Sequence, residues 1–152
     1  MAMTPRNLLA VVLLGLCIPA AYAADDARLE RNKKAVLDFY DKGLNQKDFD
    51  AASKYFGATY IQHNPTAADG PEGFKGFVEF LRSKFPQSKS EVKRVFAEGD
   101  YVILHVHAMR EPGTRGAAIV DIFRLDANGK IVEHWDVRQD VPEKAANDNT
   151  MF

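Results

Sequence analysis

Cysteine is almost missing from this chain. Cys17 is the only one in 152 residues, so no disulfide can form within the chain. A domain of this kind must be stabilised by its core packing. The composition allows this, because 46% of the residues are hydrophobic and ten are phenylalanine. The length fits one compact domain and not two.

The chain also lacks an excess of positive charge. Lys and Arg number 20 against 21 Asp and Glu, which gives a formal net charge of −1, and no basic block appears. Proteins that bind nucleic acid usually carry a basic patch or stripe, so the sequence predicts no nucleic-acid partner. Internal repeats and low-complexity segments are missing as well.

No apolar run is long enough to span a bilayer. The longest, Leu8 to Ile18, falls short of the roughly 20 residues that a spanning helix needs. Arg6 precedes this run, and Ala21-Tyr22-Ala23 follows it as a small-residue cleavage site, which is typical of a secretory signal peptide. We therefore expect residues 1–23 to be removed. The mature domain, 24–152, is then periplasmic or secreted, without stable membrane association.

Helical periodicity dominates the first part of the mature chain. Apolar residues recur at helical spacing over 25–44 and more briefly over 48–56. The third predicted helix begins at Gly70-Pro71 and ends before Pro86. Its apolar stripe consists of Phe74, Phe77, Val78, Leu81 and Phe85.

The pattern changes to strands after the third helix. Four strands are predicted, joined by turns that contain glycine: 91–98, 101–109, 117–126 and 130–139. A further short stretch, 58–62, is extended. Helices followed by hairpins predict an α+β domain, with three N-terminal helices packed on one face of a curved antiparallel sheet.

The last hairpin carries an acidic residue, Asp121, on an apolar strand. Alternation along 117–126 groups Asp121 with Phe123 on one face. The turn Asp126-Ala127-Asn128-Gly129 favours a three-residue loop, in which Asp121 faces Trp135 and Phe123 faces Glu133. A two-residue Asn-Gly turn instead sets Asp121 opposite Asp136, and Phe123 opposite His134. We favour the first register, because two opposed carboxylates repel each other. His134 and Asp136 then face outward.

The hairpin VDIFRL…GKIVEHWDV, the segment YIQHNP and the tail VPE…NDNTMF resemble the SnoaL-like polyketide cyclase family, which is part of the nuclear transport factor 2-like superfamily. The resemblance runs from about Leu29 to Phe152. It implies a cone-shaped α+β barrel with a pocket between the helices and the concave sheet. The characterised cyclases close a ring by intramolecular aldol condensation without metal or cofactor.

The resemblance also implies site residues. It assigns acid–base chemistry to Asp121, with a nearby strand histidine at the position of His107. A carboxylate in an apolar pocket is a suitable general base, because loss of hydration raises its pKa. The alternative is a buried carboxylate that only bridges strands. The expected substrate is a small apolar or carbonyl compound, and no cofactor is expected.

Other residues are candidates on position alone. His63 lies where a strand end meets a loop, and we include it as a third catalytic residue, although it could equally cap the turn. His105 shares a strand face with His107, and both could instead be polar residues on a half-exposed strand. The predicted substrate-binding residues are His105, Phe123, Trp135, Glu133, Tyr60 and Phe77.

Two further alternatives stay open. His105, His107, His63 and Asp121 could together hold a divalent metal ion, but two-residue spacing on a strand is a weak signal, and no metal is predicted. A non-catalytic module that binds a small molecule would have the same apolar pocket. Val120, Ile122 and Val132 are expected on the outer sheet face, which predicts a homodimer that packs sheet to sheet.

Overall fold

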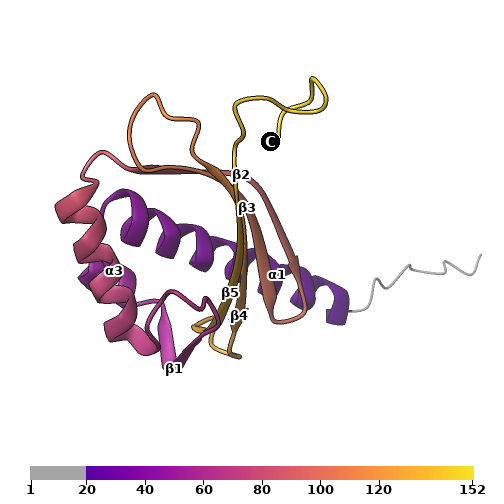
Figure 1. The fold of residues 1–152 in the computed structure, drawn as a ribbon. Helices are drawn as coiled ribbons and strands as arrows, with labels where there is room; N and C mark the ends of the chain where they lie inside the picture. Colours follow the sequence, from indigo (N-terminus) through magenta and orange to yellow (C-terminus); the bar gives the residue numbers. More distant parts are fainter. Residues whose placement is uncertain (1–19) are drawn as a thin grey trace, which may run out of the picture.

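Helices lie on one side of a five-stranded sheet in the computed structural model, which describes residues 20–152 (Figure 1). Most of the predicted signal peptide, 1–23, lies outside the described residues, so its removal stays a prediction. Among residues 20–152, none of the helices has the length and apolar character needed to cross a membrane.

The first predicted helix forms as α1, Ala20–Tyr40, and continues into a turn of π-helix, η1, Asp41–Asn45. Its buried face includes Val36 and Phe39. Gly43 in η1 lies against α3, since a Cβ atom at this position would be 2.6 Å from Cζ of Phe74. Glycine is therefore favoured at this contact between η1 and α3.

The other two helices also form where expected. The short α2, Phe49–Ser53, is capped by the Asp48 side chain, which accepts a hydrogen bond from the Ala51 backbone N–H. The longer α3, Gly70–Lys84, begins with proline in its first turn. It buries Phe74, Val78 and Leu81 against the body, as the apolar stripe predicts.

The sheet has the order β1-β5-β4-β3-β2. The strands are β1 Phe56–Gln62, β2 Lys89–Glu98, β3 Tyr101–Met109, β4 Ala117–Leu125 and β5 Ile131–Asp140. The four predicted strands pair antiparallel, but β1 adds to β5 in parallel. The sheet is therefore mixed and not purely antiparallel, and it is not closed into a complete barrel. The predicted α+β class is confirmed.

A bulge in β5 sets the register of the last hairpin. The turn forms as predicted, with Gly129 at φ 75° and the Asp126 N–H donating to the Lys130 carbonyl. Leu125 pairs with Ile131, as the three-residue loop requires, but the next pair is Arg124 with Glu133. Val132 is the extra residue, so from this point the favoured register is wrong by one position.

The bulge exchanges the two faces of β5. Asp121 lies opposite Asp136, and Phe123 lies opposite His134. His134 and Asp136 thus point to the helix-covered inner face, and Glu133 and Trp135 point to the outer face. This is the register that the sequence analysis disfavoured. Val132, expected on the outer face, is buried, and its Cγ1 atom lies where a Cβ on Gly57 would clash, at 2.6 Å.

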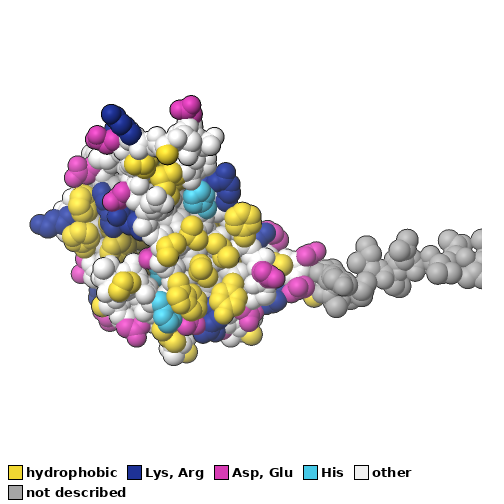
Figure 2. Space-filling model, turned by 45° about the vertical axis from the view of Figure 1, so that its right-hand side comes forward, with side chains coloured by type: hydrophobic (Ala, Val, Ile, Leu, Met, Phe, Trp, Pro, Cys, Tyr) yellow, Lys and Arg dark blue, Asp and Glu magenta, His cyan; other side chains and the backbone are white. Residues whose placement is uncertain are grey.

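The core fills the space between the helices and the inner sheet face. It joins side chains of α1 and α3 to alternate residues of the strands: Val36, Phe39, Phe74, Val78, Val102, Leu104, Val106, Phe123, Leu125 and Ile131. Figure 2 brings the right-hand side of Figure 1 forward, away from α3, and shows hydrophobic side chains gathered there too. Phe96, Tyr101 and Val137 are exposed large apolar residues of the described chain.

Candidate functional site

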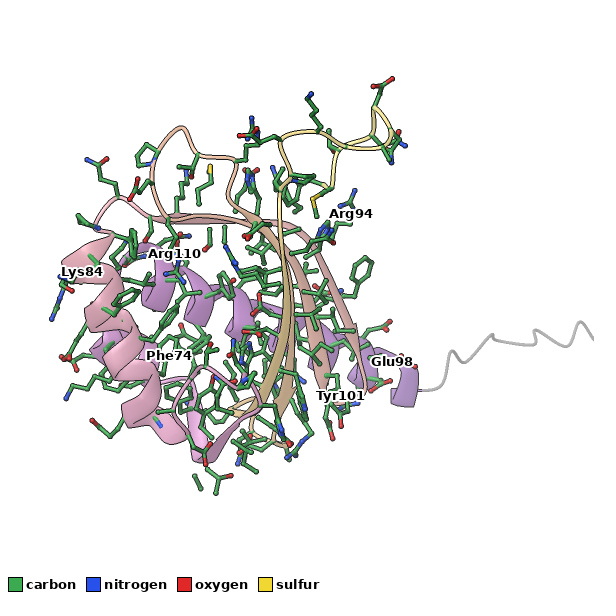
Figure 3. The ribbon with its side chains drawn as sticks, viewed as in Figure 1. Phe74, Lys84, Arg94, Glu98, Tyr101 and Arg110 are labelled. Atoms are coloured by element: carbon green, nitrogen blue, oxygen red, sulfur yellow. The ribbon has the colours of Figure 1, made fainter. Side chains whose placement is uncertain are left out.

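A pocket of about 530 Å³ lies between the helices and the inner sheet face. Three predicted binding residues line it: Phe77 from α3, Tyr60 from β1 and Phe123 from β4. Phe39 and Phe74 add further apolar wall. Figure 3 shows side chains of α3, including Phe74, turned toward the sheet across this space. Aromatic side chains thus form much of the wall, and polar and charged side chains complete it.

Asp121 is the buried acid of that wall. Only 4% of the residue is exposed, so the prediction that Asp121 points inward is confirmed. The Tyr40 hydroxyl donates to Oδ2 at 3.0 Å, and His134 Nε2 lies 3.1 Å from Oδ1. Burial raises the pKa of Asp121, and the hydrogen bonds from His134 and Tyr40 oppose this rise. The pocket therefore holds a carboxyl group whose charge is costly but partly compensated.

The hydrogen bonds of Gln62 show that His134 Nδ1, the ring nitrogen on the side away from Asp121, carries a proton. Gln62 Oε1 accepts from the Asn64 backbone N–H at 2.9 Å, which identifies this atom as the amide oxygen. His134 Nδ1 lies 2.9 Å from the same oxygen and must donate to it. His134 Nε2 then either accepts a proton from a neutral Asp121 or donates one to the carboxylate. One hydrogen bond thus joins His134 Nε2 to Asp121 Oδ1.

The Tyr60 hydroxyl can donate a hydrogen bond to a ligand. Gln62 Nε2 donates to the Tyr60 oxygen at 3.2 Å, and no acceptor for the phenolic hydrogen appears among the described residues. Burial, together with the charges of Asp121 and Asp136, raises the pKa of Tyr60, so the hydroxyl stays protonated at neutral pH. It can donate a hydrogen bond to a ligand oxygen in the pocket.

The opposed carboxylates of Asp121 and Asp136 are separately compensated. Asn64 Nδ2 lies 2.8 Å from both Asp136 oxygens, while Asp121 is bonded to Tyr40 and His134. Asn64 Oδ1 accepts from the backbone and side chain of Thr66, which orients the amide. The repulsion that argued against this register is thus reduced by donors that lie far away in the sequence.

Among the described residues, Asp121, His134 and Asp136 are close enough together to act as ligands of one metal ion. One ligand atom from each lies within 4.8 Å of the others. This set differs from the alternative that the sequence left open, because His63, His105 and His107 do not converge on Asp121. In the described arrangement, Asp121 and His134 are hydrogen-bonded to each other and Asp136 is bonded to Asn64.

His105 and His107 lie on the outer face, which corrects their expected position beside Asp121. His105 pairs with Val120 and His107 with Ala118, whereas Asp121 pairs with Leu104 on the other face. His107 Nε2 bonds to the Arg115 carbonyl at 2.8 Å. The C-terminal ring of Phe152 packs over both histidines, with its centroid 4.2 Å from that of His107. The tail therefore docks on the outer face and does not close the pocket.

His63, Trp135 and Glu133 form a second outer group, and this corrects their expected pocket position. The His63 and Trp135 rings stack with centroids 4.6 Å apart. Glu133 lies 2.8 Å from His63 Nε2 and accepts from Arg124 Nε at 2.6 Å. Both hydrogen bonds lower the pKa of Glu133, and the one with His63 has the larger effect. None of the three lines the pocket.

Sequence reasoning missed three polar residues of the site, Tyr40, Gln62 and Asn64. It placed two others, His134 and Asp136, on the outer face. One signal was available. Ile131 and Val132 are adjacent apolar residues, and both are buried, as a bulge allows and regular alternation does not. Tyr40 was read only as part of an apolar helix face.

Solved structures similar to this chain share its fold. A putative hydroxylase from Streptomyces galilaeus is 22% identical, with a TM-score of 0.59, over 75% of this chain and 82% of its own. A putative polyketide cyclase from Bacillus cereus is 19% identical, with a TM-score of 0.58, over 71% and 74%. An NTF2-like protein of unknown function from Burkholderia xenovorans is 23% identical, with a TM-score of 0.62, over 78% and 91%.

These likenesses support the cone-like α+β fold of NTF2-like proteins. The search against curated proteins gave no significant match. The profile of the SnoaL-like domain matches residues 36–134, which runs from α1 to the site histidine in β5 and covers well over half of the chain. By this match, and by the fold and pocket that accompany it, the chain belongs to the family of SnoaL-like domains.

Proposed function

We propose that this protein is a cofactor-free acid–base enzyme that acts on a small carbonyl compound, in the manner of an aldol cyclase or isomerase. The observation that carries the proposal is the buried Asp121 carboxyl, bonded to Tyr40 and His134 at the wall of an apolar pocket. A carboxyl with a raised pKa in an apolar pocket suits proton transfer near neutral pH.

In the proposed reaction, ionised Asp121 removes a proton from the carbon next to the substrate carbonyl. The C–H electrons move toward the carbonyl oxygen, which becomes an enolate. Tyr60 donates a hydrogen bond to this oxygen, and such donors are most effective in a site that excludes water. In an isomerisation, Asp121 returns the proton to another carbon. In an aldol reaction, the enolate carbon first adds to a second carbonyl of the substrate, and Asp121 then gives its proton to the alkoxide that this addition forms.

His134, and not the predicted His107, is the strand histidine next to Asp121. Its Nδ1–H is held by Gln62, so its Nε2 is aimed at Asp121 Oδ1. The hydrogen bonds from His134 Nε2 and from the Tyr40 hydroxyl compensate the charge of ionised Asp121, which would otherwise be isolated in an apolar wall. His134 is a positioning and charge-balancing partner, and Asp121 is the group that touches the substrate.

Deuterium exchange tests the proposal without knowledge of the natural substrate. A panel of aryl ketones and β-keto esters is incubated with the protein in D₂O, and NMR follows exchange next to the carbonyl. The wild-type protein should accelerate exchange for at least one compound, and Asp121→Asn should abolish most of that acceleration. Equal exchange by both proteins throughout the panel would instead favour the non-catalytic binding module.

Export and dimerisation are further parts of this proposal. The signal-like segment 1–23 supports a periplasmic or secreted location, which N-terminal sequencing of the protein from a periplasmic fraction tests. On the outer face, Val120 and Ile122 lie beside the exposed Val137 and support a homodimer that packs sheet to sheet. Sedimentation at micromolar concentration tests this association.

A further inference from the structure

The end of the pocket away from Asp121 is cationic. Arg110, which follows β3, and Arg138 in β5 both line the cavity. Arg138 lies on the inner face, because it pairs with Ile119, which itself pairs with the inward Val106. Arg110 reaches the same cavity from the end of β3. Figure 3 places Arg110 between the C-terminal end of α3 and the sheet. Two positive groups therefore lie at one end of the pocket, and the Arg138 side chain, which is 53% exposed, marks this end as its mouth.

Arg110 is held in place by aromatic rings and not by an acid. Its guanidinium carbon lies 5.2 Å from the centroid of Phe77 and 5.6 Å from that of Phe85, both from the α3 region. Among the described residues, no carboxylate forms an ion pair with it. Burial, and then the charge of Arg138, lower the pKa of Arg110, so the two guanidinium groups act on each other. An anion between them would relieve this repulsion.

Ser88 adds unused hydrogen-bonding capacity beside Arg110. Lys89 pairs with Met109 at the end of the β2–β3 ladder, so Ser88 and Arg110 follow at the next position on each strand. Ser88 lines the same pocket and is 9% exposed, yet its Oγ has no hydrogen-bond partner. Buried hydroxyls without partners are rare in folded proteins. A ligand oxygen is a natural partner for it.

Arg138 connects this end of the pocket to the acid–base group. It lies two residues beyond Asp136 on the same face of β5, a separation of about 7 Å along the strand. Its only ion pair in the described chain is with Asp140, at 2.5 Å, and both side chains are more than half exposed. Such a surface pair is weak, so Arg138 remains available to a stronger anion.

We infer that the pocket takes a substrate with a carboxylate at one end, held by Arg110, Arg138 and the Ser88 hydroxyl, and an apolar body that extends to Asp121. This inference rests on the proposed function and specifies its substrate class. The pocket is then polarised, with two arginines at the mouth and two aspartates at the inner wall. A ligand acid would be repelled from Asp121 and Asp136, which directs the carbonyl and not the acid to the base.

Isothermal titration with two matched probes tests the inference. Cinnamate and its neutral amide, cinnamamide, have nearly the same shape and differ in charge at pH 7. Wild-type protein should bind cinnamate more tightly. Arg110→Gln should weaken cinnamate binding by about tenfold or more, because charge-assisted hydrogen bonds are lost, and should leave cinnamamide within about twofold. Ser88→Ala should act in the same direction, but less strongly.

Arg94→Gln is the matched control, since Arg94 lies on the outer face, bonded to His105 Nδ1 at 3.0 Å. It should bind both probes as wild type does. Equal wild-type affinity for the two probes, or an equal loss of both in Arg110→Gln, would overturn the acid-binding assignment. These titrations involve no turnover. If cinnamate is not preferred but Asp121-dependent exchange is observed, only the carboxylate-binding assignment is wrong. If cinnamate is preferred but no such exchange is observed, the proposed reaction is wrong and the carboxylate site remains.

Discussion

Two carboxylates on one hairpin experience opposite environments. Asp121 and Glu133 each lie within hydrogen-bond distance of a histidine ring nitrogen and accept from one further donor. Asp121 faces the pocket, where burial raises its pKa. Glu133 faces outward, where hydrogen bonds from His63 and Arg124 lower its pKa. The partners are similar, so the difference comes from burial and from the permanent charge of arginine.

The same contrast separates the four histidines. His63, His105 and His107 lie on the outer face, stacked against Trp135 or Phe152, and only His134 lies at the pocket. A histidine next to a carboxylate is therefore not evidence of a site in this fold. The face of the sheet decides whether such a pair can reach a ligand.

The largest expected effect is on turnover at Asp121. Asp121→Asn should reduce exchange by roughly 10²–10⁴-fold, the usual contribution of a general acid–base group. The amide can accept from Tyr40 and donate to His134 Nε2, so the fold should persist. Glu133→Gln is the control from the opposite face and should retain exchange within about twofold. If Glu133→Gln is the more damaging change, the reaction does not take place in the pocket.

The second-largest effect on turnover is expected for Tyr60→Phe. It removes the hydroxyl proposed to stabilise the enolate oxygen, and loss of one such donor costs about 10²–10³-fold in kcat. The matched control is Tyr101→Phe, because Tyr101 is 44% exposed and its ring lies near Trp135 on the outer face. Rates measured by the same NMR exchange assay should separate the two variants. A loss seen only in KM for Tyr60→Phe would indicate ground-state binding instead.

Much of the fold follows from local pattern. The Phe stripe of α3, the Asp126–Gly129 turn and the four antiparallel strands form where the sequence predicts them. These features depend on residues close together in the chain. The pairing of β1 with β5 was not predicted, because a parallel partner some 70 residues away leaves no periodic signal at either strand.

The site was only partly predictable for a related reason. Asp121 could be placed inward because it alternates with Phe123 on a regular strand. His134 could not, since the single extra residue Val132 exchanges the faces of β5 after a correctly predicted turn. The donors that make the opposed carboxylates tolerable, Tyr40 and Asn64, come from other elements.

The pH dependence of stability should also differ between Asp121 and Glu133. The two residues should act in opposite directions, and the effects should be smaller than those on turnover. Folded Asp121, with its raised pKa, retains its proton at pH values where the unfolded chain has lost it. The free energy of unfolding therefore falls as pH rises from about 4, the unfolded value, through the folded pKa. Asp121→Asn removes this loss, so in urea titrations its stability relative to wild type should increase between pH 4 and pH 7.

Glu133 should behave in the reverse way. Its folded pKa is lowered, so its contribution to stability is present above the unfolded pKa and is lost as pH falls through the folded value. Glu133→Gln should therefore be less stable than wild type at pH 7 and should approach it in acid. Parallel pH profiles for the Asp121 and Glu133 variants would contradict the contrast between the two faces.

The smallest expected effect concerns the C-terminal ring. Phe152 packs over His107 and His105 on the outer face, and aromatic pairs of this kind contribute about 0.5–1.5 kcal/mol beyond the area that they bury. Phe152→Ala should lower the free energy of unfolding by at least about 0.5–1.5 kcal/mol in urea titrations, because the area that the ring buries is lost as well. Turnover and KM should stay unchanged, because the ring lies on the face opposite Asp121. Ring contacts with His107 are reported by its NMR signals, which should shift in the variant while those of His134 do not. A rise in KM would mean that the tail covers the pocket during catalysis, and that the outer face takes part in the reaction after all.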